Sequence, residues 1–263
     1  MSSTAVPTIF SLEDDDRPAL VQHFRERGWV AVDAAAPDAA TLAGWVDEVA
    51  TIPDGQDGVL QHYEGTDAGP VVCRSENFVP VHAGLRALLC RGGFVDAASA
   101  LLGEPAVLYK EKINCKLAGG AGYSPHQDAP AYPMIDVHVS AMVAVDDADE
   151  SNGCLEIVSD CFDTVLPLDE RGCIEASVAA TLAWEPVPLP AGQTLWFHSR
   201  TPRRSSPNRS DRPRRALYPT YNAAREGDLR AAYYEAKRAA FAAAPPGDRA
   251  RVSLIGDFEG RPV

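Results

Sequence analysis

The sequence predicts a single, mainly β domain, a barrel or jelly roll with helices on both sides of it in the chain. The chain has 263 residues, of which 46% are hydrophobic, enough for a full core in one domain. Apolar residues follow helical spacing through much of 1–105, whereas short extended runs separated by turn residues fill 106–222. Helical spacing then returns in 223–263, which is expected to form a C-terminal helix and tail.

The N-terminal part is expected to be mainly helical. Residues 14–27 place Leu20, Val21 and Phe24 on one helical face, Gly28 ends that helix, and a β-branched run, WVAVDA, predicts a strand. The segments 37–50 and 85–102 also have helical spacing, and Gly103 ends the second.

The segment 106–222 predicts the β core. Its extended runs are AVLYKEKINCKL, IDVHVSAMVAVDD, GCLEIVS, WEPVPL, QTLWFHS and RRALYPTYN. Turn-forming residues separate them at 119–123 (GGAGY) and 146–153 (DDADESNG). Regularly spaced short strands of this kind are typical of a barrel or jelly roll. A last helix is expected over 225–244.

The charge and the hydropathy pattern restrict the partners. A net charge of −13 repels phosphate backbones and acidic lipid surfaces, so nucleic acid and membrane surfaces are not expected partners. No run approaches the roughly 18 apolar residues of a membrane span, and the N-terminus lacks the pattern of a signal peptide. We expect a cytoplasmic protein that acts on a small molecule; the sequence does not predict its oligomeric state.

The segment SPHQDAPAY carries the sharpest local pattern. His126 and Asp128 are two residues apart, so in an extended segment their side chains point to the same side. One imidazole and one carboxylate are two of the three ligands of the facial triad that holds non-heme Fe(II). An H-x-D pair is common by chance, and a turn histidine that bonds to Asp128 explains it equally well in isolation.

The order of motifs around this pair resembles the phytanoyl-CoA dioxygenase family. From Tyr109 to Asn222 the chain reads KEKINCKL, a glycine loop, HQDAP, NGCL, AGQTLWF and SSPNRSDRPRRALYPTYN. ENFVPVHAGL, YYEAKR and GDFEGRPV resemble the branch that hydroxylates small aminophosphonates. The resemblance implies a double-stranded β-helix (jelly-roll, cupin-like) core, Fe(II) and 2-oxoglutarate as cofactors, and hydroxylation of an unactivated carbon.

The resemblance also implies roles for single residues. The family's last site segment reads H-x-S-x-x-N. An arginine eleven residues after this histidine binds the distal carboxylate of 2-oxoglutarate. Here Arg203 stands at the histidine, with Ser205, Asn208 and Arg214 at the other positions. A guanidinium suits a carboxylate because it donates two parallel hydrogen bonds. Gln127 could assist through its amide, and Asn114, which shares a strand face with Lys112, could reach the keto acid or the substrate.

Arg203 is the main departure from the family, because an arginine has no lone pair to offer a metal. Three interpretations follow. His198, five residues earlier, replaces the missing ligand, which requires a bulge because an odd offset reverses the facing. Alternatively, His126 and Asp128 hold iron with 2-oxoglutarate and water. In the third, iron is lost and the Arg203 guanidinium pairs with Asp128.

The sequence therefore predicts an Fe(II)/2-oxoglutarate-dependent oxygenase that acts on a small polar or anionic metabolite. Its expected metal ligands are His126, Asp128 and His198, and its expected 2-oxoglutarate ligands are Arg214, Ser205, Gln127 and Asn114. The alternative is a family member that has lost iron and uses the same pocket, with His126, Asp128 and Arg203, for non-oxidative chemistry or ligand binding.

Overall fold

A computed structural model describes residues 8–11, 16–33, 37–244 and 252–263, and it shows two β-sheets that face one another. The larger sheet has eight strands in the order β1-β2-β10-β7-β12-β5-β4-β3, and the smaller has four in the order β6-β11-β8-β9. The strands of the larger sheet are β1 (Ile9–Phe10), β2 (Trp29–Val32), β3 (Leu60–Thr66), β4 (Gly69–Glu76), β5 (Ala106–Lys116), β7 (His138–Ala144), β10 (Thr194–His198) and β12 (Arg214–Ala223). Those of the smaller sheet are β6 (Tyr123–His126), β8 (Leu155–Ile157), β9 (Glu185–Val187) and β11 (Arg203–Ser205).

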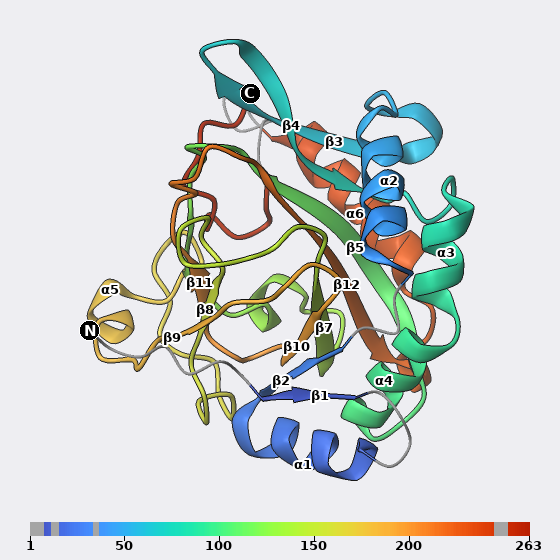
Figure 1. Ribbon diagram of the computed structural model, residues 1–263, viewed down its shortest axis with the longest axis vertical. Coiled ribbons are helices and arrows are strands. Elements are labelled where there is room, and N and C mark those ends of the chain that lie inside the picture. Colours follow the sequence, from blue (N-terminus) through green and yellow to red (C-terminus); the bar gives the residue numbers. More distant parts are fainter. Residues whose placement is uncertain (1–7, 12–15, 34–36, 245–251) are drawn as a thin grey trace.

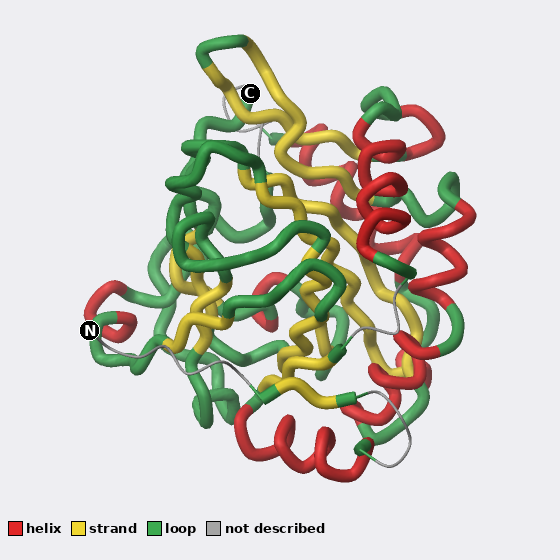
Figure 2. The backbone as a smooth tube through the Cα atoms, viewed as in Figure 1, coloured by secondary structure: helices red, strands yellow, loops and turns green. Residues whose placement is uncertain are grey.

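The helices gather mainly at the larger sheet, along the right and lower sides of the molecule as drawn in Figures 1 and 2. They are α1 (Arg17–Arg27), α2 (Ala39–Ala50), α3 (Ala83–Cys90), α4 (Gly93–Leu102), α5 (Ala176–Ala179) and α6 (Arg230–Ala243). The single helix expected over 85–102 is wrong, because Gly92 has a φ of 65° and divides it into α3 and α4. The mainly β core with flanking helices is confirmed.

Strict alternation along the central strands builds a hydrophobic core on each side of the larger sheet. On β10, Trp196 packs among the helices, while Leu195 and Phe197 point to the smaller sheet. On β12, Leu217 packs on the helix side, and Tyr218 points to the smaller sheet. Successive side chains of a strand point to opposite faces, so one amphipathic run serves two cores. The side between the two sheets also carries the polar side chains described below.

The hairpin of β3 and β4 was not predicted, because its strands lie within the segment expected to be mainly helical. β4 pairs with β5 and so widens the larger sheet. The final segment, Val252 to Val263, returns to both sheets: Gly65 on β3 donates its N–H to the carbonyl of Arg261, and Tyr123 on β6 pairs with Phe258. Residues that are distant in the sequence are thus brought to β6.

A buried ion pair joins β4 to α6. The ammonium of Lys237 lies 2.6 and 2.5 Å from the two carboxylate oxygens of Glu76, and both side chains are 2% exposed. Arg74 and His62 contact the same carboxylate at 3.8 and 3.4 Å. Burial by itself would raise the pKa of Glu76, but Lys237 and His62 outweigh it and hold that pKa well below its usual value. Glu76 is therefore ionised and surrounded by cationic partners.

Replacing Glu76 by glutamine is expected to lower the free energy of unfolding by about 3–5 kcal/mol, because it leaves Lys237 and Arg74 buried without their counter-charge. Urea unfolding measures the change. The matched control is Glu104→Gln, which removes the more exposed partner of Arg225 and should cost no more than about 1 kcal/mol. Equal effects of the two substitutions would contradict this account.

Among the helices of the described residues, none combines the length and the apolar composition that a membrane crossing requires.

Candidate active site

The segment that carries His126 and the segment that carries Arg203 are neighbouring strands of the smaller sheet. β6 pairs with β11 in antiparallel register, and His126 lies directly opposite Arg203. Residues that face each other across a strand pair have their side chains on the same side of the sheet. Both side chains are buried, at 5% and 4% exposure. The pairing therefore brings the H-x-D motif and the arginine that departs from the family pattern to one place.

Arg203 forms an ion pair with Asp128, as the third interpretation requires. Its Nη2 lies 2.5 Å from Oδ1 of Asp128, and the guanidinium carbon lies 4.7 Å above the ring of Phe197. Burial alone would raise the pKa of Asp128, but Arg203 and then Lys110 hold it far below its ordinary value, so Asp128 is ionised. Nη1 of Arg203 is buried and has no hydrogen-bond partner in the described part of the chain.

His126 faces the carboxylate of Asp257, which lies in the segment GDFEGRPV but is not among the predicted site residues. Its Nδ1 lies 2.7 Å from the carbonyl oxygen of Ser124, and its Nε2 lies 3.3 Å from Oδ2 of Asp257 in the C-terminal segment. A carbonyl oxygen only accepts hydrogen bonds, so Nδ1 carries a proton. Burial and then Arg203 lower the pKa of His126, which favours the neutral ring with its lone pair on Nε2. A backbone partner at one ring nitrogen is the usual arrangement of a metal-binding histidine.

A small cavity of about 20 Å³ lies in front of these groups. Its lining side chains come from five strands of the two sheets and from the C-terminal segment, and they include His126, Arg203, Asp257, Lys112, Asn114, Tyr123, Leu155, Ser205 and Tyr218. This volume holds one water molecule or one ion, since about 10–15 Å³ suffices for a water. Larger ligands therefore require the cavity to widen.

The inner side of β5 and β12 carries two further buried cations beside this cavity. Arg214 and Lys116 are opposite each other in the strand pair. Nζ of Lys116 donates to Oγ of Ser205 at 2.9 Å and to the carbonyl of Gly153 at 3.2 Å. Nε and Nη1 of Arg214 are buried and have no hydrogen-bond partner among the described residues. Burial, and then Arg214, lower the pKa of Lys116 to about 7.

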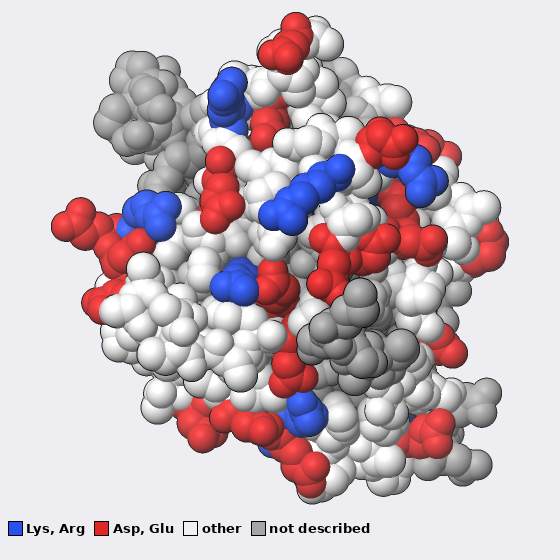
Figure 3. All heavy atoms as spheres, turned by 60° about the vertical axis from the view of Figure 1, so that its left-hand side comes forward, with Lys and Arg blue, Asp and Glu red and all other residues white. Residues whose placement is uncertain are grey.

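Positive charge is thus concentrated inside an acidic protein. The cationic side chains that are at most 4% exposed are Arg74, Lys110, Lys116, Arg203, Arg214 and Lys237. Acidic side chains are spread widely over the face of the molecule shown in Figure 3. Buried cations are costly unless an anion accompanies them. Glu76 accompanies Lys237 and Arg74, and Asp128 accompanies Arg203. Arg214, whose Nε and Nη1 have no partner among the described residues, is therefore the cation best suited to an anionic ligand.

Four predicted site residues do not line this cavity: Asp128, Arg214, Gln127 and His198. Asp128 pairs with Arg203, which does line it, and Arg214 lies opposite Lys116. The side-chain amide of Gln127 is engaged elsewhere: Nε2 donates to the carbonyls of Thr164 and Arg200, and Oε1 accepts from the N–H of Leu166. The expectation that Gln127 binds the keto acid is corrected, because Gln127 points away from its two neighbours, as strand alternation requires.

The structure also disagrees with the first interpretation, in which His198 replaces the missing metal ligand. It ends β10 in the larger sheet, its ring packs 5.3 Å from that of Phe162, and its Nδ1 accepts from the N–H of Arg200. The chain crosses from the larger to the smaller sheet between His198 and Arg203, so these residues face different surroundings. His198 is not among the cavity's lining residues, and the structure contradicts its role as a substitute ligand.

Two residues at the site, Lys116 and Asp257, are absent from the sequence-based predictions. Lys116 could have been found, because it continues the two-residue alternation of Lys112 and Asn114 along one strand face. Asp257 belongs to GDFEGRPV, one of the segments that carry the resemblance, but only the folded chain brings it next to His126. Asn114 and Ser205 do line the cavity, and Oδ1 of Asn114 accepts from Nε of Arg74 at 2.8 Å.

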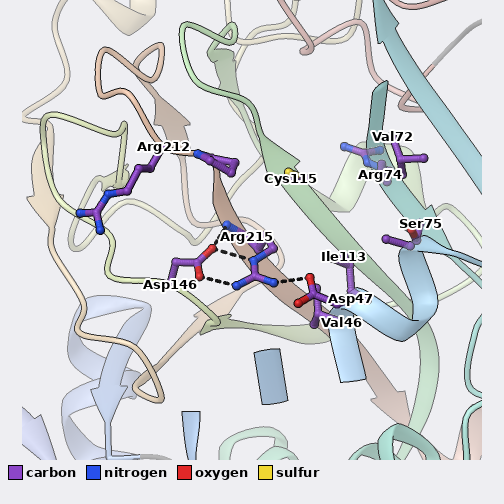
Figure 4. Close-up of a pocket in the computed structure, with 12 residues that line it drawn as sticks. Val46, Asp47, Val72, Arg74, Ser75, Ile113, Cys115, Asp146, Arg212 and Arg215 are labelled. Atoms are coloured by element: carbon purple, nitrogen blue, oxygen red, sulfur yellow. Dashed lines mark hydrogen bonds and ion pairs between the residues drawn. The ribbon is translucent and has the colours of Figure 1, made fainter. Parts of the chain in front are cut away.

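A larger pocket of about 430 Å³ lies between α2 and strands β4, β5 and β12. Figure 4 shows Arg215 in it, held by Asp146 and Asp47. Arg215 follows Arg214 on β12 and therefore points to the opposite face of the sheet. This pocket is separate from the cavity at His126, and Arg215, Asp146 and Asp47 within it are already paired with one another.

The residues fit the 2-oxoglutarate that the resemblance implies, but as they stand they do not form a complete iron site. The two unpartnered nitrogens of Arg214, next to Lys116 and Ser205, suit the distal carboxylate of 2-oxoglutarate. For iron, His126 offers a lone pair, and Asp128 and Asp257 offer carboxylates. As the side chains stand, no group of three or more His, Cys, Asp or Glu in the described ranges is arranged around one metal position.

Comparison with known proteins identifies the family. The sequence model of the phytanoyl-CoA dioxygenase family matches residues 24–216. The chain is 43% identical over 248 residues to a methylphosphonate hydroxylase of Gimesia maris, covering 92% of this chain and 95% of that protein. It is 37% identical over 208 residues to a 2-aminoethylphosphonate dioxygenase from an uncultured bacterium, covering 77% and 79%.

Solved structures show the same fold. AviO1 of Streptomyces viridochromogenes has a TM-score of 0.65 at 27% identity and covers 79% of this chain and 95% of its own. EctD of S. alaskensis, solved with 2-oxoglutarate and 5-hydroxyectoine, has a TM-score of 0.68 at 17% identity and covers 78% and 76%. The expected cupin-like oxygenase fold is confirmed. The chain is an oxygenase that belongs to the phytanoyl-CoA dioxygenase family.

Proposed function

We propose that this chain is an Fe(II)- and 2-oxoglutarate-dependent oxygenase that hydroxylates a small phosphonate. The observation that carries the proposal is the set of buried cations between the two sheets, above all the unpartnered nitrogens of Arg214 and Arg203. The two relatives at 43% and 37% identity are named for phosphonate substrates. The phosphonate and 2-oxoglutarate both carry negative charge, and the buried cations can form ion pairs with them.

Arg214 and Lys116 are proposed to hold the distal carboxylate of 2-oxoglutarate. The guanidinium fork donates two parallel hydrogen bonds, and the ammonium of Lys116 adds a third contact from the opposite strand. Ser205, whose Oγ accepts from Lys116, can donate its own hydrogen to the same carboxylate. The three groups orient the keto acid, so that its keto end points toward His126 and Asp128.

The phosphonate is proposed to bind at the part of the cavity lined by Lys112, Asn114 and Tyr218. Nζ of Lys112 lies 5.3 Å from the centre of the Tyr218 ring, on the cavity side of the strand. Burial and then Arg74 lower the pKa of Lys112 well below its usual value, and a bound anion would favour its charged form. The anionic group would be fixed there and the neighbouring carbon directed toward His126. Bound iron supplies the activation of O₂; the chain supplies the position of the carbon and excludes bulk water by burial.

Turnover assays test the substrate class. Purified protein with Fe(II), 2-oxoglutarate and O₂ should convert methylphosphonate or 2-aminoethylphosphonate to a hydroxylated product, with one succinate and one CO₂ formed for each product. Acetate and methanesulfonate are matched controls, because they keep the methyl group and change the anion. His198→Ala should keep most of the activity. Succinate formation that does not depend on any phosphonate would contradict the proposed substrate class.

Because Lys116 has a pKa of about 7, binding of 2-oxoglutarate is expected to be pH-dependent. In the free protein Lys116 loses its proton as the pH rises through about 7, whereas a bound carboxylate favours the charged form. Binding should therefore take up a proton above about pH 7, and affinity should fall by up to about tenfold per pH unit. Calorimetry in buffers of different ionisation enthalpy measures the uptake. Lys116→Met should abolish it, and an unchanged pH dependence in that variant would assign the effect to another group.

A second candidate function is ligand binding or non-oxidative chemistry without iron. The Arg203–Asp128 ion pair favours it, because a guanidinium occupies the position of a metal ligand. Metal titration separates the two functions: protein that binds 2-oxoglutarate but no divalent metal would support the second one.

A further inference from the structure

A second group of buried polar side chains, Lys110, His138 and Ser199, lies outside the cavity at His126. All three are at most 3% exposed. Both ring nitrogens of His138 and Oγ of Ser199 are buried without a hydrogen-bond partner among the described residues. We propose that this group, the inner polar layer, binds a carboxylate of the substrate at the end opposite the phosphonate. The inference rests on the proposed function and narrows its substrate class to phosphonocarboxylates.

Strand pairing and one turn bring the inner polar layer together. His138 begins β7, and its carbonyl accepts from the N–H of Ser199 at 3.0 Å. The carbonyl of Ser199 accepts in turn from the N–H of Ala129 at 2.9 Å, which ties it to the turn that follows β6. The ring of Tyr132, at the end of this turn, lies 5.4 Å from the ring of His138, and Nζ of Lys110 lies 4.5 Å from its centre. Tyr132 therefore contacts members of the layer from two different strands.

Lys110 is a buried cation without an anion of its own. Asp128 and Glu76 are the acids that act on its charge, but Asp128 is paired with Arg203, and Glu76 is paired with Lys237. Burial lowers the pKa of Lys110 to about 8, so the ammonium is still the main form at neutral pH. A buried cation is stabilised when an anion accompanies it. A carboxylate of the ligand would supply that anion.

The uncharged groups of the layer also suit a carboxylate. A histidine ring carries at least one N–H in either protonation state, and a serine hydroxyl has one hydrogen to donate. His138 and Ser199 can therefore donate to the same carboxylate that Lys110 attracts. Asn222, opposite His138 on β12, adds a buried Oδ1 without a partner among the described residues. An ammonium group would suit this oxygen, but Lys110 would repel it, so the charge of the layer favours an anion.

The spacing along β5 sets the length of the substrate. Lys112, in the proposed phosphonate site, and Lys110 are two residues apart in a regular stretch of the strand and so share one face. Two residues of a strand span about 7 Å, and a two-carbon chain between a phosphonate and a carboxylate covers a similar length. The fitting probe is thus 3-phosphonopropionate. Because the ring of Tyr132 contacts both Lys110 and His138, binding requires this ring to move aside.

Calorimetric binding to the full-length chain tests the inference, with 2-oxoglutarate present and O₂ excluded. Three phosphonates are compared: 3-phosphonopropionate, 3-methylbutylphosphonate, which has the same shape without the second charge, and 3-aminopropylphosphonate, which carries the opposite charge. The wild type should bind 3-phosphonopropionate at least about 30-fold more tightly than either of the others, because they leave a buried cation without its partner.

Variants separate the two ends of the substrate. Lys110→Met should reduce the preference for 3-phosphonopropionate to less than about 3-fold, whereas Lys110→Arg, which keeps the charge, should retain most of it. Lys112→Met is the matched control and should weaken binding of all three compounds by similar factors, because all three carry the phosphonate. Circular dichroism establishes that each variant is folded. Ser199→Ala, a smaller change, should lower the preference by about 10-fold and repeats the test if Lys110→Met does not fold.

The outcomes distinguish the inference from the proposed function. If the wild type binds the three phosphonates with affinities within about 3-fold of one another, or binds 3-aminopropylphosphonate most tightly, the layer holds no carboxylate, although the proposed function stands. If the wild type binds 2-oxoglutarate but none of these compounds and no methylphosphonate, the proposed function and the inference fail together.

Discussion

Replacing His126 by alanine is expected to lower turnover by about a thousandfold, because metal assistance contributes several kcal/mol and each factor of ten corresponds to about 1.4 kcal/mol. His126 is the imidazole that lines the cavity, with its Nδ1 fixed by Ser124. Succinate formation and product formation should fall together.

The effect should come from the site and not from the fold. His62 offers a matched control, since it is also buried, at 9% exposure, but lies on β3 beside Glu76. His62→Ala should lower the unfolding temperature through the lost packing, while the folded protein keeps its turnover. If the His126→Ala variant keeps the activity of the wild type, His126 takes no part in the chemistry.

Replacing Arg214 by methionine is expected to weaken 2-oxoglutarate binding by about 100-fold. Removing one partner of a buried, charge-assisted pair costs about 2–5 kcal/mol, and a factor of ten corresponds to about 1.4 kcal/mol. The unliganded variant should unfold at a higher temperature than the wild type, because Arg214 is buried with two unpartnered nitrogens. Calorimetric binding and thermal unfolding measure the two opposite effects.

Arg215 is the control for Arg214. It follows directly in the chain, but it points into the separate pocket and pairs with Asp146 and Asp47 (Figure 4). Arg215→Met should leave the affinity for 2-oxoglutarate unchanged, whereas Arg214→Lys should show an intermediate loss, because it keeps the charge and loses the fork. Comparable losses in the Arg214 and Arg215 variants would place the keto acid elsewhere.

Local sequence patterns predicted those features of the site that depend on residues close together in the chain. His126 and Asp128, two residues apart, are both buried; His126 lines the cavity, and Asp128 is joined to it through Arg203. The family resemblance pointed to Arg203 and Arg214, which are both buried cations. Strand alternation also explains why Gln127 points away and why Lys116 continues the face of Lys112 and Asn114. These properties follow from a period of two residues, which is fixed by backbone geometry.

Other features depend on which segments meet. The break between α3 and α4 follows from a local φ at Gly92, but the hairpin of β3 and β4 exists because β5 offers it an edge. His198 stands five residues before Arg203, and the chain crosses from the larger to the smaller sheet between them. The place of this crossing decides whether His198 reaches the site. A pattern search along the sequence carries no information about that crossing.

The sequence by itself determined the mainly β class, the H-x-D pair and the substitution of arginine for the expected third ligand. Only the tertiary structure decided what surrounds that arginine: Asp128 as its ion-pair partner, and Asp257 of the C-terminal segment against His126. The physical reason is that side chains from segments far apart in the sequence come together at the site only when the sheets form. The motif sets the spacing of His126 and Asp128, whereas pairing between distant segments decides which other side chains lie beside them.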